Sequence, residues 1–172
     1  MNDAQELRLE KITYLNWHDV EDLHLTEEQK EYIADNVSSL ALAGVIREAG
    51  FRVFTMGIYQ GEEPIGFVMI GYDIPYEPDD DLNEKYWFTR SSYYIWRFML
   101  DERYQGKGYG RKAMDLVLDF IRSGPCRKAQ YAWLTYNQEN IVARNLYASL
   151  GFEEVPEASD PEDDEINAVL RL

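Results

Sequence analysis

Cysteine is nearly absent from this chain, and it lacks long apolar runs and an excess of basic residues. The single cysteine, Cys126, cannot form an intramolecular disulfide, which indicates a reducing compartment. No apolar run reaches the roughly 18–20 residues that cross a bilayer, so no membrane contact is expected. Residues 1–6 hold neither a basic cluster nor an apolar run, and no secretory signal is predicted there. These absences together predict a cytoplasmic protein.

Basic residues are outnumbered almost two to one. Against 17 Lys and Arg stand 32 Asp and Glu, and the formal net charge is −15. Such a charge repels nucleic-acid phosphates at long range, which argues against a nucleic-acid partner and favours small cations. The 172 residues are 45% hydrophobic and 14% aromatic, enough for one ordinary core. No repeat, linker or low-complexity tract divides them, so a single domain over 1–172 is predicted.

Hydrophobic periodicity predicts a mixed order of strands and helices. The segment Thr26–Gln29 fits a capping box, and the helix it opens is expected to run to Gly50. The acidic stretch 73–84 is expected to be a solvated loop. The order β-α-α-β-β-β-α-β-α-β-β is typical of an α/β (α+β) sheet of mixed direction. The expected strands are 7–12, 52–59, 65–72, 92–100, 131–135, 152–155 and 166–172, and the expected helices are 16–25, 26–49, 108–123 and 140–149.

Three glycines alternate where the helix at 108–123 should begin: Gly106, Gly108 and Gly110. Glycine lets main-chain N–H groups approach a ligand, and the positive end of the helix dipole favours an anion there. The segment 95–130 adds eight basic residues against four acidic ones. A phosphate or pyrophosphate site is therefore predicted. A Walker A loop is excluded because Gly-Lys-Ser/Thr is missing, and a Rossmann fingerprint because Arg111 stands where its third glycine should be.

Two motifs in order resemble a known family. Residues Gln105 to Gly110 fit the pattern Gln/Arg-x-x-Gly-x-Gly/Ala, which resembles the acetyl-CoA loop of the GCN5-related N-acetyltransferase (GNAT) superfamily. Residues Asn140 to Phe152 resemble its second signature, Asn-x-x-Ala-x-x-x-Tyr-x-x-x-Gly-Phe. The strand end Arg97–Asp101, which leads into the loop, is similar to that of the bacterial spermine/spermidine (diamine) N-acetyltransferase branch. The stretch 73–84 is a departure from that branch.

The resemblance implies a mostly antiparallel central sheet that helices flank and whose central strands splay apart. It implies acetyl-CoA as co-substrate and direct attack by a primary amine of a polyamine or diamine in a ternary complex. The main chain of the central strand is expected to pair with the pantetheine arm, and the glycine turn to hold the pyrophosphate. The implied cofactor-binding residues are Phe98, Met99, Leu100, Gln105, Gly106, Lys107, Gly108, Tyr109, Gly110, Arg111 and Asn140.

Tyr147, in the second motif, is the implied general acid. A phenol near pKa 10 is protonated at neutral pH and donates to a departing thiolate. The general base is not visible, since the strand 92–100 holds no carboxylate; a water chain ordered by Tyr94 is one hypothesis. Glu28 and Glu31 are candidates to hold a distal ammonium, because the early helix overlies the acceptor site in this superfamily. Their alternative interpretation is as solvated acids of a first helical turn.

Other chemistry finds little support in the residues. His18 and His24 stand six apart with no cysteine partner, so no metal site is predicted. Cys126 has no histidine partner and is interpreted as structural. Two alternatives stay open: acetylation of another amine, such as an aminoglycoside, an amino acid or a protein N-terminus, and a non-catalytic acetyl-CoA binding module. A homodimer is also left open, because many relatives pair.

Overall fold

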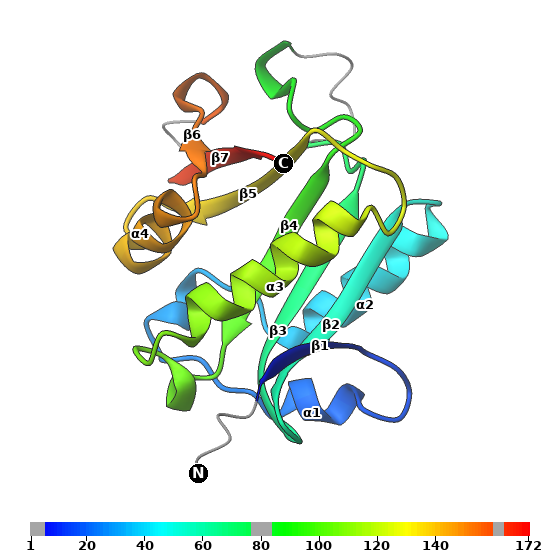
Figure 1. The fold of residues 1–172 in the computed structure, drawn as a ribbon, viewed down its shortest axis with the longest axis vertical. Helices are drawn as coiled ribbons and strands as arrows, with labels where there is room; N and C mark the ends of the chain where they lie inside the picture. The colour runs from blue at the N-terminus through cyan, green and yellow to red at the C-terminus, as the bar shows by residue number, and fades with distance from the viewer. Residues whose placement is uncertain (1–5, 77–83, 160–163) are drawn as a thin grey trace.

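One open sheet organises the computed structural model, which describes residues 6–76, 84–159 and 164–172 (Figure 1). Within these residues seven strands lie in the order β1-β2-β3-β4-β5-β7-β6. Every neighbouring pair is antiparallel except β4 and β5, which run parallel. The predicted mixed, mostly antiparallel sheet is confirmed. The bounds are Leu7–Lys11 (β1), Arg52–Gln60 (β2), Glu63–Tyr72 (β3), Tyr93–Leu100 (β4), Tyr131–Asn137 (β5), Glu153–Glu154 (β6) and Glu165–Arg171 (β7).

Helices cover both faces of this sheet. On one face lie α1 (Trp17–Glu21) and α2 (Asn36–Glu48), whose Val20 and Ala43 pack in one buried cluster with Met69 of β3. On the other face α3 (Tyr109–Ser123) runs across β2, β3 and β4 (Figure 1). The last helix, α4 (Ile141–Ser149), stands beside β5 and β7. Short 3-10 turns complete the chain, including η1 (Gln29–Glu31) and η3 (Glu102–Tyr104).

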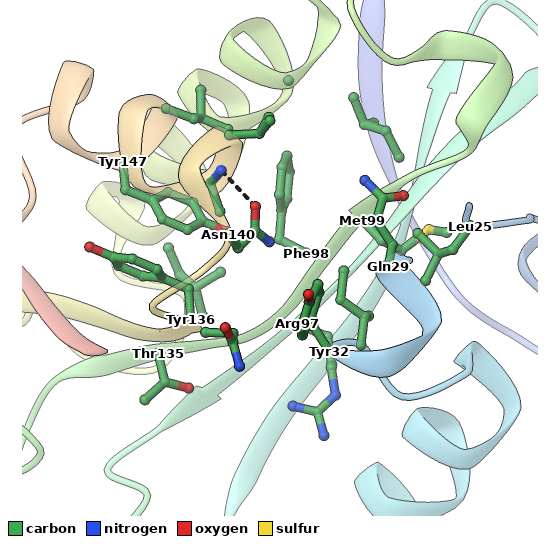
Figure 2. A pocket seen from close by; sticks show the side chains of 18 of the residues that line it. Leu25, Gln29, Tyr32, Arg97, Phe98, Met99, Thr135, Tyr136, Asn140 and Tyr147 are labelled. Atoms are coloured by element: carbon green, nitrogen blue, oxygen red, sulfur yellow. Dashed lines mark hydrogen bonds between the residues drawn. The ribbon is translucent and has the colours of Figure 1, made fainter. Parts of the chain in front are cut away.

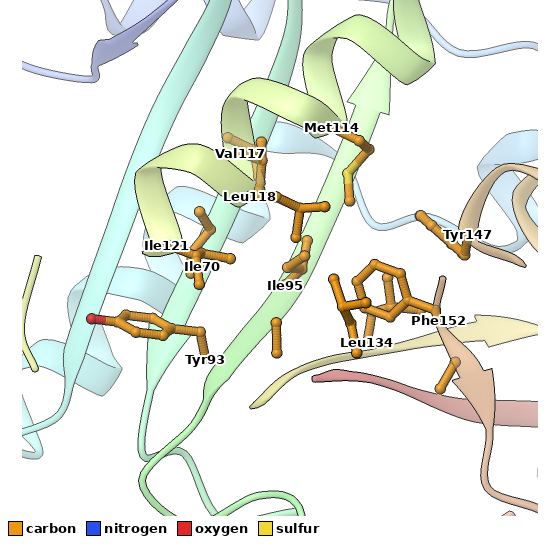
Figure 3. Close-up of a cluster of buried hydrophobic side chains, with 14 of the residues drawn as sticks. Ile70, Tyr93, Ile95, Met114, Val117, Leu118, Ile121, Leu134, Tyr147 and Phe152 are labelled. Atoms are coloured by element: carbon orange, nitrogen blue, oxygen red, sulfur yellow. The ribbon is translucent and has the colours of Figure 1, made fainter. Parts of the chain in front are cut away.

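The helix α3 is the main cover of its face. Its buried side chains recur at helical spacing and form one stripe that meets Ile70 and Ile95 of the sheet (Figure 3). Full burial of each large apolar side chain contributes about 1.5–3 kcal/mol. Gly124 ends the helix with φ +70°, a conformation that glycine adopts without steric cost. The stripe consists of Ala113, Met114, Val117, Leu118 and Ile121.

The predicted helix from Thr26 to Ala49 is wrong. The capping-box hydrogen bonds between Thr26 and Gln29 do form, but the turn they begin, η1, ends at Glu31. The chain then extends at Asp35 (φ −60°, ψ 156°), whose carboxylate caps the separate helix α2 by accepting from the Ser38 N–H at 2.8 Å. Asp35 thus acts as the N-cap of a new helix, and the first helical turn does not continue through it. The expected helix over 16–25 is likewise shorter and ends at Glu21.

The two parallel central strands part soon after they meet. β4 and β5 are paired only at Tyr93 with Ala132 and at Tyr94 with Trp133. Just beyond, Met69 of β3 pairs with Arg97 while Ile70 pairs with Ile95, so Trp96 is an extra residue that bends β4. The prediction of splayed central strands is confirmed.

Parts of two acidic loops, 77–83 and 160–163, lie outside the described residues. Most of the acidic stretch 73–84 therefore cannot be compared with its prediction. Across the described ranges, no helix has the length and apolarity needed to cross a bilayer. In the same ranges no group of three His, Cys, Asp or Glu side chains could hold a metal ion.

Candidate active site

A cavity of about 320 Å³ lies where the central strands part (Figure 2). Its walls are β4 from Ile95 to Leu100, the end of β5, the helix α4 and the turn η1. Leu25, Gln29 and Tyr32 face it from one side and Asn140 and Tyr147 from the other. The site thus spans the gap in the sheet, and its lining comes from elements on both faces.

The edge of β4 that faces this cavity has no partner strand beyond Tyr94 within the described chain. The Asp101 N–H donates to the Ile65 carbonyl of β3 at 2.9 Å, and a Cβ on Gly66 would lie 2.5 Å from the Met99 carbonyl. Main-chain groups alternate along a strand, so those of Met99 point toward β3 and those of Phe98 and Leu100 toward the cavity. An open edge of this kind pairs with an extended chain.

The glycine turn before α3 is open and uncapped. Gly106 and Gly108 have φ of +69° and +82°, and a Cβ at either would meet nothing within 4 Å. Backbone conformation, not lack of space, is therefore what requires glycine at both positions. No side chain caps the first turn of α3, so its N–H groups are available to an anion. This arrangement fits a pyrophosphate.

Of the predicted cofactor-binding residues, most line the cavity and four do not. Lys107 donates to the Arg103 carbonyl at 2.6 Å, and Arg111 donates to the Ser149 carbonyl at 3.1 Å on α4. Tyr109 accepts a hydrogen bond from Gln60 at 2.8 Å. These side chains hold the turn in place and leave their main chain as the contact available to a ligand. The predicted residues that line the cavity are Phe98, Met99, Leu100, Gln105, Gly106, Gly110 and Asn140, and those beside it are Lys107, Gly108, Tyr109 and Arg111.

Gln105 is engaged within the protein. Its amide nitrogen donates to the Leu100 carbonyl at 2.8 Å, and its carboxamide exchanges two hydrogen bonds with that of Gln29, at 2.8 and 2.9 Å. The glycine turn is thereby tied both to the end of β4 and to η1. Gln105 shapes the mouth of the cavity through these bonds.

Asp101 anchors the same junction from inside. Its carboxylate is fully buried and accepts from the His24 N–H at 2.9 Å, the Arg103 N–H at 2.9 Å and the Arg103 Nε at 2.8 Å. Burial alone would raise the pKa of Asp101, but the hydrogen bonds from Arg103 and His24 outweigh it and hold that pKa below its usual value. The loop before η1 is thus fastened to the start of the glycine turn.

We expect Asp101→Asn to destabilise the fold by about 1–3 kcal/mol near pH 7. In the variant, the side-chain NH₂ of the introduced asparagine would replace one carboxylate oxygen and would face N–H groups of His24 or Arg103, which are also donors. The pKa of Asp101 is lower in the folded protein than in the unfolded chain, so its ionised carboxylate stabilises the fold at pH values above the unfolded pKa. This stabilisation is lost as the pH falls through the folded-state pKa. The difference in urea midpoint between wild type and variant should therefore shrink from pH 7 toward pH 3. Asp115→Asn, on the exposed face of α3, is the control; a pH-independent difference would contradict the assignment.

Tyr147 lies on α4 with its hydroxyl unengaged. Asn140 begins this helix, and its side chain accepts from the Ala143 N–H at 3.0 Å. The Tyr147 ring packs between Tyr136 and Phe152 and is 8% exposed, at the cavity wall. Among the described residues nothing hydrogen-bonds its hydroxyl. Burial raises the pKa of Tyr147, so the phenol stays protonated and is free to donate into the cavity.

The three predicted acceptor-side residues are placed differently from one another. Glu31 lines the cavity, whereas Glu28 does not. Both carboxylates, together with Glu139, add to the effect of burial and raise the pKa of Tyr32 at the cavity wall. Tyr94 is buried and does not line the cavity; its ring stacks on Trp133 with the ring centroids 3.7 Å apart, and burial raises its pKa to about 12. Its hydroxyl is engaged with Thr135 Oγ1 at 3.2 Å.

Several lining residues were not anticipated. Tyr32 and Ile33 fall within the continuous helix expected over 26–49, and only the break before Asp35 turns them to the cavity. Arg97 belongs to the strand motif but carried no assigned role. Tyr136 and Asn137 lie just past the expected end of β5, next to the second motif, and that adjacency was the available signal. Glu165 begins β7 and is brought in by its pairing with Asn137.

Comparison with known proteins gives one consistent result. The model of the "Acetyltransferase (GNAT) family" matches residues 9–152. The chain is 29% identical over 147 residues to a spermine/spermidine N(1)-acetyltransferase of Bacillus subtilis, covering 86% of this chain and 88% of that protein.

Solved structures share the fold at low identity. An acetyltransferase from Thermus thermophilus has a TM-score of 0.70 at 17% identity, over 98% of this chain and 99% of that one. AAC(6')-Ib in complex with paromomycin and acetyl-CoA has a TM-score of 0.69 at 16% identity, over 96% and 93% of the two chains. These structures share the fold of this chain.

Proposed function

We propose that this chain, which belongs to the acetyltransferase (GNAT) family, transfers the acetyl group of acetyl-CoA to a primary amine of a polyamine or diamine. Acetyl transfer from acetyl-CoA follows from the family; the acceptor is the proposal. The observation that carries it is one cavity with an open strand edge, an uncapped glycine turn and the protonated Tyr147 hydroxyl on one side and carboxylates on the other.

The donor side of the cavity suits coenzyme A in three places. The uncapped first turn of α3, after Gly106 and Gly108, would hold the pyrophosphate through main-chain N–H groups. The cavity-facing main-chain groups of Phe98 and the N–H of Leu100, whose carbonyl accepts from Gln105, would pair with the pantetheine arm as an added strand does. Asn140, at the start of α4, would contact the arm from the opposite wall.

The reaction is a direct displacement. The amine nitrogen attacks the thioester carbonyl carbon, a C–N bond forms and the C–S bond breaks. A main-chain N–H of the β4 edge would polarise the carbonyl oxygen. The Tyr147 hydroxyl would give its proton to the leaving sulfur and recover one from the proton that the amine loses to water. This exchange balances protons without a carboxylate on β4, which has none.

Acidic groups on the acceptor side support a cationic substrate. Glu31 and Glu165 line the cavity from η1 and β7, and Glu28 and Glu139 lie near its Tyr32 wall. Their field attracts an ammonium group and aligns an extended diamine across the gap. The relative at 29% identity, whose name specifies spermine and spermidine, points to the same class.

The decisive test is coenzyme A release from acetyl-CoA across a panel of amines. Spermidine, spermine and short diamines should be acetylated with higher kcat/KM than aminoglycosides, amino acids with a single amine and peptide N-termini. A higher kcat/KM for an aminoglycoside, a monoamino acid or a peptide N-terminus would contradict the polyamine proposal and identify that compound class as the acceptor. Binding of acetyl-CoA without release on any amine would instead favour a non-catalytic binding module.

Neutralising the acids beside Tyr32 should weaken amine binding specifically. We expect Glu28→Gln with Glu31→Gln to raise the KM for spermidine ~3- to 10-fold with little change in kcat, because charge pairs in a wet cavity are each weak. The effect should fade at high salt. Glu48→Gln with Glu153→Gln removes two exposed acids outside the cavity and controls for the same change in net charge. An unchanged KM for spermidine would mean that Glu28 and Glu31 are solvated acids of a helical turn and do not bind the substrate.

A further inference from the structure

Among the described residues that line the cavity, Arg97 is the one cation, and Glu31 and Glu165 are the acids. Arg97 pairs with Met69, whose side chain packs with Val20 and Ala43 on the α1–α2 face. Cross-strand partners share a face, so the Arg97 side chain points to that face and away from Tyr147. Figure 2 shows its guanidinium near Tyr32, pointing away from the Phe98 ring and from Tyr147. The cavity is therefore not uniformly acidic.

One buried N–H donor of the Arg97 guanidinium has no hydrogen-bond partner. Its NH1 donates to the Trp96 carbonyl at 2.8 Å, while its Nε is buried with no hydrogen-bond partner. Within the described residues no carboxylate forms an ion pair with it. A buried donor on a charged group without a partner costs free energy, and a ligand oxygen would recover it. Arg97 is thus suited to an anionic or carbonyl oxygen, because a bare polyamine offers it only like charge.

Opposite charges lie close together at this end of the cavity. Burial raises the pKa of the Tyr94 hydroxyl, and the charge of Arg97 lowers it while that of Glu165 raises it, so both groups act at the same point. Glu31 faces them from η1. A molecule that presents a carboxylate to Arg97 and an ammonium to Glu31 or Glu165 would meet both charges. A straight diamine meets only the carboxylates.

We propose that Arg97 selects acceptors that carry a carboxylate as well as two amines, so that diamino acids of the lysine and ornithine class are preferred to the corresponding bare diamines. The inference rests on the proposed acetyl transfer to a diamine and narrows its acceptor. One amine is acetylated, the second amine is held by Glu31 or Glu165, and the carboxylate accepts from Arg97, a charge-assisted interaction whose planar geometry favours bidentate contact.

Two matched substrate pairs test this directly. Lysine and cadaverine, and ornithine and putrescine, differ only by the carboxylate. In the wild type, kcat/KM from coenzyme A release should be at least ~10-fold higher for the carboxylated member of each pair. Arg97→Met should lower the value for lysine by about that factor and leave cadaverine unchanged or improved. Arg97→Lys should show part of the wild-type preference for lysine over cadaverine, because the introduced side chain keeps the positive charge but lacks the planar pair of N–H donors of the guanidinium.

Controls separate selection from folding and from the proposed function. Arg90→Met removes an exposed arginine outside the cavity and should leave both ratios unchanged. Melting temperature and coenzyme A affinity of each Arg97 variant should match the wild type. Titration of lysine and cadaverine into the protein saturated with coenzyme A measures binding without turnover. Should no amine be acetylated while lysine still binds through Arg97, the transfer reaction fails and the carboxylate site stands.

The inference is overturned by equal kcat/KM and equal binding for lysine and cadaverine in the wild type. It is also overturned when Arg97→Met changes both substrates by the same factor, since that result reports a purely structural arginine. A rise for cadaverine without any wild-type preference for lysine would mean that Arg97 only repels cations, and this too contradicts the proposal.

Discussion

Replacing Tyr147 by Phe is expected to lower kcat by about 10²- to 10⁴-fold, the usual contribution of a positioned general acid. The ring would still pack between Tyr136 and Phe152, so the fold and the affinity for coenzyme A should change little. The hydroxyl has no hydrogen-bond partner among the described residues, so its removal leaves no described group unsatisfied. Stopped assays of coenzyme A release with spermidine, beside calorimetry of coenzyme A binding, measure the two effects separately.

The pH profile gives a second check on this role. Because burial raises the pKa of Tyr147, its protonated form should persist throughout the neutral and mildly alkaline range. Wild-type kcat should therefore rise with pH as the amine loses its proton and show no fall below about pH 10. Tyr136→Phe is a matched variant, since its hydroxyl is engaged with Glu154 at 2.7 Å. Equal losses in the two variants would point to packing and would rule out a specific acid.

Gly108→Val is expected to weaken coenzyme A binding about ten- to a hundredfold. Gly108 has φ +82°, where a β-branched residue is strained, and the chain would relieve that strain by rotating the first N–H groups of α3 away from the diphosphate. Loss of one charge-assisted hydrogen bond costs about 1.5–3 kcal/mol, which corresponds to the stated range. Calorimetry with coenzyme A measures the change.

A donor without the diphosphate makes this prediction specific. S-acetylpantetheine has the reactive arm but not the nucleotide, so its kcat/KM should be nearly equal in wild type and Gly108→Val. Gly50→Val is the matched glycine control: Gly50 has φ +94° and nothing within 4 Å of an added Cβ, but it follows α2 and does not line the cavity. If Gly108→Val left coenzyme A affinity intact, the glycine turn would not be the diphosphate site, and the donor would have to bind elsewhere.

Local patterns were enough to predict most elements, including the two helix starts that bound the proposed donor site. The strand from Tyr93 to Leu100, the helix that begins after Gly108 and the helix that begins after Asn140 lie where periodicity and capping placed them. These elements depend on neighbours within a few residues, such as the Asn140 side chain and the glycine at φ +82°. Contiguous motifs carry such information because their contacts are short in sequence.

The acceptor side was harder to predict because its residues come from three segments that lie far apart in the sequence, around η1 and on β4 and β7. The continuous helix expected from Thr26 hid Tyr32, since the competing cap at Asp35 cannot be weighed from periodicity alone. Glu165 reaches the cavity only through the pairing of β7 with β5. Nothing in the sequence around Arg97 indicated that its Nε would be buried without a partner.

The amino-acid sequence by itself determined the family, the acyl donor and the order of the elements, because a glycine turn and a capped helix are local structures with few alternatives. Only the tertiary structure decided what the acceptor meets. The parting of β4 from β5 opens a cavity whose charges come from η1, β4 and β7, and the balance between Glu31, Glu165 and Arg97 depends on contacts between residues more than sixty positions apart.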